Sequence, residues 1–190
     1  MRKSLFFMLL SLTTAAWASA PEGLESWTRR SLDRLPTYHE DREVSGKAEQ
    51  LDAIARAVAD VSRDQPLPPQ QWATLVLLVG HHESGFSMRI IRNECKKHEC
   101  DRGRARGFGQ VWRNSLNGQD WLDAPGNVAV QAKLTSDALE RAYWNCKRSG
   151  VDPIAGTLSA FAGKRCGASW PGLQARLATY ARLTRAGGKS

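Results

Sequence analysis

Apolar side chains recur at three- and four-residue steps over several stretches of this chain, the spacing of amphipathic α-helices. The first long stripe begins near Ser45 and contains Leu51, Ile54 and Val58. The proline-rich stretch 64–69 then interrupts the pattern, because proline cannot continue a helix. The sequence therefore predicts one helix that ends before these prolines and a second that begins at the last of them.

The segment from Pro69 to Glu83 is apolar on most of its sides, which predicts a buried helix at the centre of the fold. Segment 84–106 is rich in charges and glycine and has the character of a loop, and no alternating run predicts a strand. The 190 residues are enough for one domain of ordinary size. We expect an all-α domain of about six helices, with a short helix over 24–35 before it and further helices over 107–115, 126–147, 153–162 and 171–185.

The first twenty residues have the three parts of a secretory signal peptide: a basic start, an apolar stretch and a run of small residues. We predict a signal peptide over 1–18, with cleavage after Ala20 as the alternative. Residues 19–44 are then an N-terminal extension, and 45–190 form the domain. The apolar stretch is too short for a membrane span, so the mature protein is expected in the periplasm or outside the cell, as a monomer.

The charge balance is basic, with 27 lysines and arginines against 19 acidic residues. Removal of the signal peptide leaves a net charge of about +6, which suits a polyanionic partner. Export and the absence of a zinc-finger, RNA-binding or basic-zipper pattern argue against nucleic acid. An anionic cell wall is the expected counterpart, and the alternative is that the charge only keeps the protein soluble.

The chain has four cysteines, all in its second half: Cys95, Cys100, Cys146 and Cys166. In an oxidising compartment an even number indicates disulfides, although four cysteines allow three pairings. We expect Cys95–Cys100 to close a short loop and Cys146–Cys166 to join a helix end to the segment after the next helix. The alternative, a zinc site on Cys95, His98 and Cys100, has a spacing unlike that of the common zinc ribbons. No metal or other cofactor is expected.

Glu83 lies at the end of the apolar helix, on the same face as Trp72 and Val79. Burial and the negative end of the helix dipole both disfavour its anion and are expected to raise its pKa, although Arg89 or Arg92 would oppose that shift. A carboxylic acid that is still protonated near neutral pH is what a glycosidase needs as its general acid. The alternative is that Glu83 merely ends a helix in water.

Three short segments occur in a definite order: Glu83-Ser84, the strip 107–110 with the sequence Gly-Phe-Gly-Gln, and Ala160-Phe161-Ala162. This order resembles the E-S, G-L-M-Q and A-Y-N motifs of the soluble lytic transglycosylases, a lysozyme-like family that cleaves peptidoglycan. The resemblance extends over about residues 47–186. It implies a glycan-cleaving enzyme with a single catalytic acid.

Carried over by position, Glu83 matches the catalytic acid of the family and Ser84 the hydroxyl that helps to hold it. The glycines of the strip would let a sugar approach the backbone, and Gln110 would donate to the sugar. Phe161 stands where the family has a tyrosine, so one hydroxyl near the acid is lost. Trp112 follows the strip and is our candidate for a stacking platform. The residues expected to bind substrate are Ser84, Gly107, Phe108, Gly109, Gln110, Trp112 and Phe161.

Two alternatives to a transglycosylase remain open. The segment around Asp101 is similar to the goose-type lysozymes, in which such an aspartate assists a water molecule in hydrolysis. Asp101 would then be a second carboxylate, although a loop aspartate paired with a neighbouring arginine fits the sequence as well. The other alternative is a non-catalytic module that binds peptidoglycan or serves as a scaffold.

Overall fold

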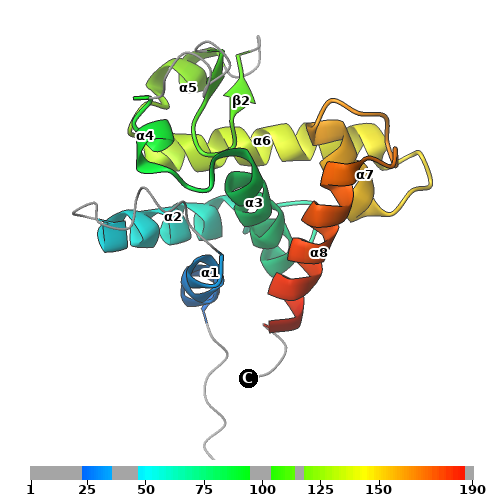
Figure 1. Cartoon of the computed structure of the whole chain (residues 1–190), viewed down its shortest axis with the longest axis horizontal. Coiled ribbons are helices and arrows are strands. Elements are labelled where there is room, and N and C mark those ends of the chain that lie inside the picture. Colours follow the sequence, from blue (N-terminus) through cyan, green and yellow to red (C-terminus); the bar gives the residue numbers. More distant parts are fainter. Residues whose placement is uncertain (1–22, 36–46, 95–103, 114–117, 187–190) are drawn as a thin grey trace, which may run out of the picture.

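The computed structural model describes residues 23–35, 47–94, 104–113 and 118–186. The predicted signal peptide and its cleavage site lie outside these ranges. Helices make up most of the described chain, which confirms the predicted all-α class (Figure 1). The elements are α1 (Leu24–Asp33), α2 (Lys47–Val61), α3 (Pro69–Ser84), α4 (Met88–Ile91), β1 (Ala105–Arg106), β2 (Val111–Trp112), α5 (Gly118–Asp123), α6 (Val128–Cys146), α7 (Pro153–Phe161) and α8 (Pro171–Ala186).

Helix α3 runs through the middle of the molecule, as its apolar sequence predicts (Figure 1). Every residue from Trp72 to Gly80 is buried. Helix α6, the longest, crosses α3 and packs against α7 and α2, while α8 lies beside α3. The indole N–H of Trp72 donates to Ser136 Oγ on α6 at 2.9 Å, so the polar group of this buried ring is satisfied.

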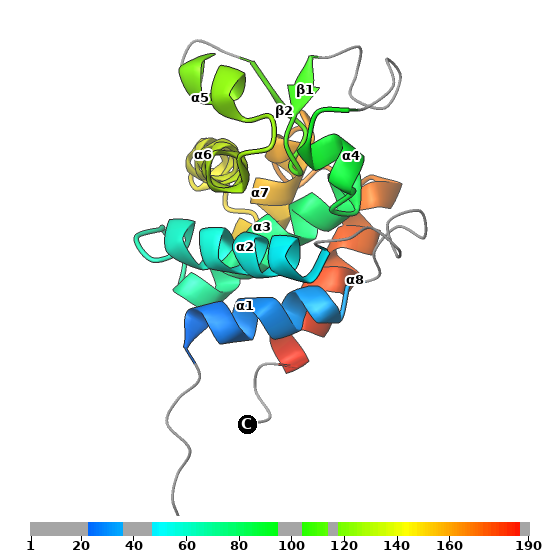
Figure 2. The ribbon, with the colours of Figure 1, turned by 90° about the vertical axis from the view of Figure 1, so that its left-hand side faces the viewer.

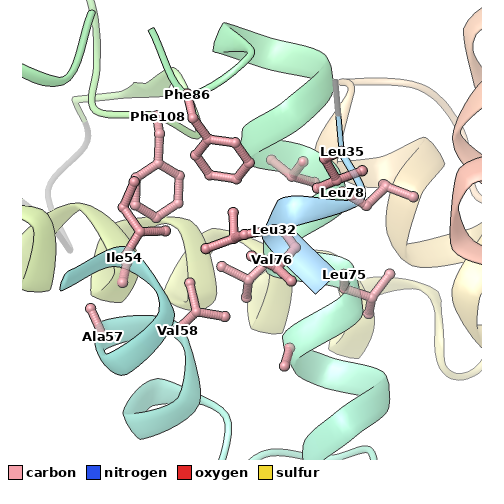
Figure 3. Packing of buried hydrophobic residues seen from close by; sticks show 14 of the residues in the cluster. Leu32, Leu35, Ile54, Ala57, Val58, Leu75, Val76, Leu78, Phe86 and Phe108 are labelled. Carbon is pink, nitrogen blue, oxygen red and sulfur yellow. The ribbon is translucent and has the colours of Figure 1, made fainter. Parts of the chain in front are cut away.

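The N-terminal helix α1 belongs to the same core as the rest of the described chain. Its Leu32 packs with Ile54 and Val58 of α2 and with Val76 of α3 (Figure 3). Trp27 is also buried in this cluster. The boundary that we placed at residue 45 therefore does not separate two packing units.

The helix predicted over 107–115 is wrong. Gly107 and Gln110 have φ angles of +70° and +48°, and left-handed backbone cannot continue a right-handed helix. The chain turns there, between two short antiparallel strands in which Ala105 faces Trp112 and Arg106 faces Val111. The prediction also missed α4 and α5. Helix α5 and this hairpin lie on the opposite side of α6 from α1 and α2 (Figure 2).

A disulfide joins Cys146, at the end of α6, to Cys166 in the connection between α7 and α8, as predicted. Cys95, Cys100 and His98 lie outside the described residues, and so do the second predicted bridge and the alternative zinc site. Within the described ranges, no helix combines the length and the apolar character that crossing a bilayer requires.

Candidate active site

A cleft of about 620 Å³ opens at the C-terminal end of α3. Its walls come from α3, β2, α6 and the end of α7, so residues far apart in the sequence meet there. Four of the predicted site residues, Glu83, Gln110, Trp112 and Phe161, line it together. The full lining is Glu83, Gln110, Val111, Trp112, Ala138, Arg141, Ala142, Asn145, Ala160, Phe161, Ala162 and Gly163.

Glu83 is held by an arginine that sequence reasoning did not consider. Arg176 Nη2 on α8 donates to Glu83 Oε1 at 2.6 Å, and the two side chains are 10% and 26% exposed, respectively. The sequence does contain an indication of this role. Arg176 follows Leu173 by three residues and so lies on the buried face of α8, where a charged residue is unexpected.

Ser84 does not play the part that the resemblance implies. Its hydroxyl donates to Gly80 O at 2.9 Å and accepts the backbone N–H of Phe86 at 3.1 Å. These bonds stabilise the end of α3 and the turn that follows. Ser84 therefore fixes the backbone next to Glu83, and its hydrogen bonds are to the main chain rather than to the carboxyl group.

The strip 107–110 differs from expectation in three of its four residues. Phe108 is fully buried and packs against Phe86 with ring centroids 5.5 Å apart, so it belongs to the core and not to a sugar-binding wall. A Cβ at Gly109 would lie 2.2 Å from Thr135 Oγ1, and one at Gly107 would lie 2.8 Å from Gln131 Cγ. Both glycines are thus needed for the packing of the strip on α6.

Gln110 and Trp112, in contrast, both line the cleft, where a substrate-binding role would place them. The Gln110 amide lines the cleft, and its Nε2 donates to Gly107 O at 2.9 Å, which orients the side chain. Trp112 is 52% exposed at the edge of the cleft, with the Arg104 guanidinium 5.9 Å from its ring centroid. A large aromatic face that is open to solvent beside a cleft is suited to contact the apolar face of a sugar.

One face of α6 forms a wall of the cleft that the sequence analysis missed. Ala138, Arg141, Ala142 and Asn145 follow one another at steps of three, one and three residues, which places them on one side of the helix. The alanines leave room for a ligand, and Arg141 and Asn145 bring polar groups. Among the described lining residues, Glu83 is the only carboxylic acid. Asp101, the possible second carboxylate, lies outside the described chain.

His82 packs between α3 and α8. Its Nε2 lies 3.3 Å from Thr179 Oγ1 of α8. Burial, together with the positive charge of Arg176, lowers the pKa of His82 to about 4, so the imidazole is neutral at physiological pH. No cluster of three or more His, Cys, Asp or Glu suited to a metal ion occurs among the residues that the structure describes.

Comparison with known proteins gives no relative for this chain: no protein-family model, no curated protein and no solved structure matches it. What points to a function is that residues of the three motif segments meet in one cleft.

Proposed function

We propose that this protein is a peptidoglycan lytic transglycosylase that cleaves the β-1,4 bond between MurNAc and GlcNAc. The observation that carries the proposal is that Glu83, Gln110, Trp112 and Phe161, which come from the three motif segments and from the strand after the second, line one cleft. A cleft of this kind, with an acid at one wall and an open aromatic face at its edge, is suited to a polysaccharide. The substrate is the glycan strand of the cell wall, and the enzyme acts as an exported monomer.

In the proposed reaction one carboxyl group is used twice. Protonated Glu83 donates its proton to the linking oxygen as the bond from that oxygen to C1 of MurNAc breaks. The carbonyl oxygen of the 2-acetamido group of MurNAc stabilises the positive charge at C1. The Glu83 carboxylate then accepts the proton of the MurNAc 6-hydroxyl as that oxygen bonds to C1. The product is a 1,6-anhydro sugar, the acid is regenerated, and no water is consumed.

The composition of the cleft supports this use of a single acid. Most sugar hydrolases need two carboxyl groups about 5–10 Å apart, whereas the described lining of this cleft contains only Glu83. The sugar can lie on Trp112, with Gln110 and Asn145 as hydrogen-bond partners. The neighbouring Arg141 brings a positive charge that suits the carboxylates of the wall peptides.

The test is to replace Glu83 by Gln, which keeps the shape of the side chain and removes its acidic proton. Release of soluble muropeptides from purified sacculi should fall by about two to four orders of magnitude. Glu49→Gln, an exposed change on α2, is the matched control and should retain the parental rate. A parental rate for Glu83→Gln would overturn the proposal. Products one water heavier than the anhydro sugar would instead favour hydrolysis assisted by Asp101.

One observation favours a second function, that of a non-catalytic module that binds peptidoglycan. The carboxyl group of Glu83 is in an ion pair with Arg176, and Phe161 provides no hydroxyl to orient an acid. For this function, the parent and Glu83→Gln would both pellet with sacculi, and neither would release soluble fragments.

A further inference from the structure

Arg176 lies in an unusual setting for a cation. Its side chain is only 10% exposed, and within the described residues its single hydrogen bond goes to Glu83. Nη1 is buried and has no acceptor in the described chain. An arginine that only joins two helices would be expected to distribute its donors over several acceptors. Replacing a buried ion pair by apolar residues often leaves stability unchanged or higher, so stability alone does not account for this pair.

The surroundings of Arg176 direct its guanidinium toward Glu83. The Trp170 ring lies with its centroid 5.4 Å from Arg176 Cζ, a cation–π distance. Gly172 makes room for this ring, because a Cβ there would lie 1.8 Å from Trp170 Cζ3. The Cys146–Cys166 disulfide ties down the chain four residues before Trp170. The tryptophan is therefore held at a defined place, and it limits where the guanidinium can go.

Arg176 bears on the carboxyl group of Glu83 through its position and its charge. Its Nη2 lies 2.6 Å from Glu83 Oε1, which holds the carboxyl group in one orientation. In the proposed reaction Glu83 is a carboxylate after it has donated its proton, and a guanidinium attracts a carboxylate more strongly than a neutral acid.

We infer that Arg176 is a positioning residue for Glu83, and this inference rests on the proposed function. It orients the carboxyl group at the wall of the cleft and stabilises the carboxylate that remains after Glu83 has donated its proton. Trp170 and Gly172 keep the guanidinium in reach of Glu83. Arg176 acts through Glu83 and takes no part in bond breaking itself.

Other polar and ionisable groups lie near this end of α3. The strip contributes Gln110 and α7 contributes Phe161, and neither carries charge at the pH of the reaction. The ionisable groups that the described residues place here are two histidines on α3, a second arginine on α8 and one arginine on the α6 wall of the cleft: His81, His82, Arg182 and Arg141. Of these, His82 is turned toward Thr179 and is neutral.

The test compares Arg176→Met, which removes the charge but keeps the length, with Arg182→Met, which removes the same charge from an exposed position on the same helix. Rates of anhydro-muropeptide release are measured from pH 4.5 to 8.5. For Arg176→Met we expect a lower maximal rate and an alkaline limb moved to higher pH, so that the ratio of the rate at pH 7 to that at pH 5 rises about threefold or more. Arg182→Met should keep the parental profile. Superimposable profiles for Arg176→Met and the parent would overturn the inference, as would an equal shift in Arg182→Met.

A second measurement separates this inference from the proposed function. NMR titration of the Glu83 side-chain carboxyl carbon needs no substrate. Its midpoint should move to higher pH in Arg176→Met and stay in place in Arg182→Met, even if the parent releases nothing from sacculi. In that case the proposed function fails while the coupling between Arg176 and Glu83 stands; an unmoved midpoint in Arg176→Met overturns the coupling itself. If thermal unfolding shows that Arg176→Met does not fold, Arg176→Gln takes its place in both measurements.

Discussion

Gln131 of α6 accepts the backbone N–H of Phe108 through Oε1, at a distance of 3.1 Å. The Nε2 atom of the same side chain donates to Ile91 O at 2.7 Å and to Ala124 O at 2.8 Å. The amide is almost completely buried. One side chain thus ties three segments to α6: the end of α4, the strip that carries Gln110, and the loop after α5. This amide therefore helps to hold the strip that contributes Gln110 to the cleft.

We expect Gln131→Leu to destabilise the protein strongly. Leucine has nearly the same size but leaves the buried N–H of Phe108 without a partner, at a cost of about 1–3 kcal/mol. It also removes one of the two hydrogen bonds that each of Ile91 O and Ala124 O accepts. The free energy of unfolding, from urea denaturation followed by circular dichroism, should fall by about 2–4 kcal/mol. Gln119→Leu, an exposed change on α5, should alter it by less than about 0.5 kcal/mol. Equal effects of the two changes would contradict the role given to Gln131.

Gly109→Ala tests the close contact between the strip and α6. The added methyl would lie 2.2 Å from Thr135 Oγ1 and 2.8 Å from its Cγ2, so the strip must move away from the helix. We expect a loss of about 1–3 kcal/mol in the free energy of unfolding, measured by chemical denaturation. Adding Thr135→Ala to this variant should restore part of the lost stability, because the second change removes Oγ1 and Cγ2 of Thr135. Gly118→Ala, where nothing lies within 4 Å of the new methyl, should leave stability nearly unchanged.

Trp112→Ala tests the proposed stacking platform. Loss of the exposed indole removes apolar contact with a sugar, worth about 0.5–1.5 kcal/mol beyond the buried area. Binding to sacculi, measured by pelleting with the Glu83→Gln protein as background, should weaken about three- to tenfold. Trp144→Ala is the matched control, because Trp144 has a similar exposure, at 48%, but does not line the cleft. A larger effect at Trp144 than at Trp112 would place the sugar elsewhere.

His82 should make the stability depend on pH. Burial first, and then the charges of Arg176, His81 and Arg182, lower its pKa to about 4 in the folded protein, whereas an unfolded chain has a histidine pKa near 6.5. Between these values the unfolded chain binds the extra proton, so the free energy of unfolding falls as the pH is lowered from about 6.5 to about 4. The contribution is on the order of 1 kcal/mol, because the imidazole keeps some solvent contact.

The measurement for His82 is a comparison of denaturation curves for the parent and His82→Gln across this pH range. Glutamine keeps a polar group near Thr179 but cannot titrate. The difference in stability between the two proteins should therefore change in the variant's favour as the pH falls. If the stability of the two proteins depended on pH in the same way, the pKa of His82 would be the same in the folded and unfolded chains.

The long helices could be predicted because each carries its own signal. Helix α3 is apolar on nearly every side, and α6 and α7 begin at Asn127 and Asp152, whose side chains cap them. The failure at 107–115 has a local cause, because the positive φ angles of Gly107 and Gln110 are set by the turn and are not visible in the pattern of apolar residues. Helices as short as α4 and α5 are determined by packing and leave little trace in the sequence.

Some residues of the candidate site could likewise be predicted from the sequence, and others could not. Glu83, Gln110 and Phe161 could be located because each lies in a short motif with a recognisable order. Arg176 and the α6 wall could not, since their importance comes from contacts between residues far apart along the chain. The pair of Glu83 with Arg176 spans 93 positions. A charge on the buried face of α8 was a visible anomaly, but nothing local indicated its partner.

The position of α1 has a practical consequence for anyone who wishes to produce a minimal version of this protein. Trp27, Leu32 and Leu35 fill part of the interior between α2 and α3. A truncated protein starting at residue 45 would expose the surfaces of α2 and α3 that these side chains cover, and such surfaces promote aggregation. The shortest version in which the hydrophobic core stays buried must therefore include all of α1 and begin before Leu24.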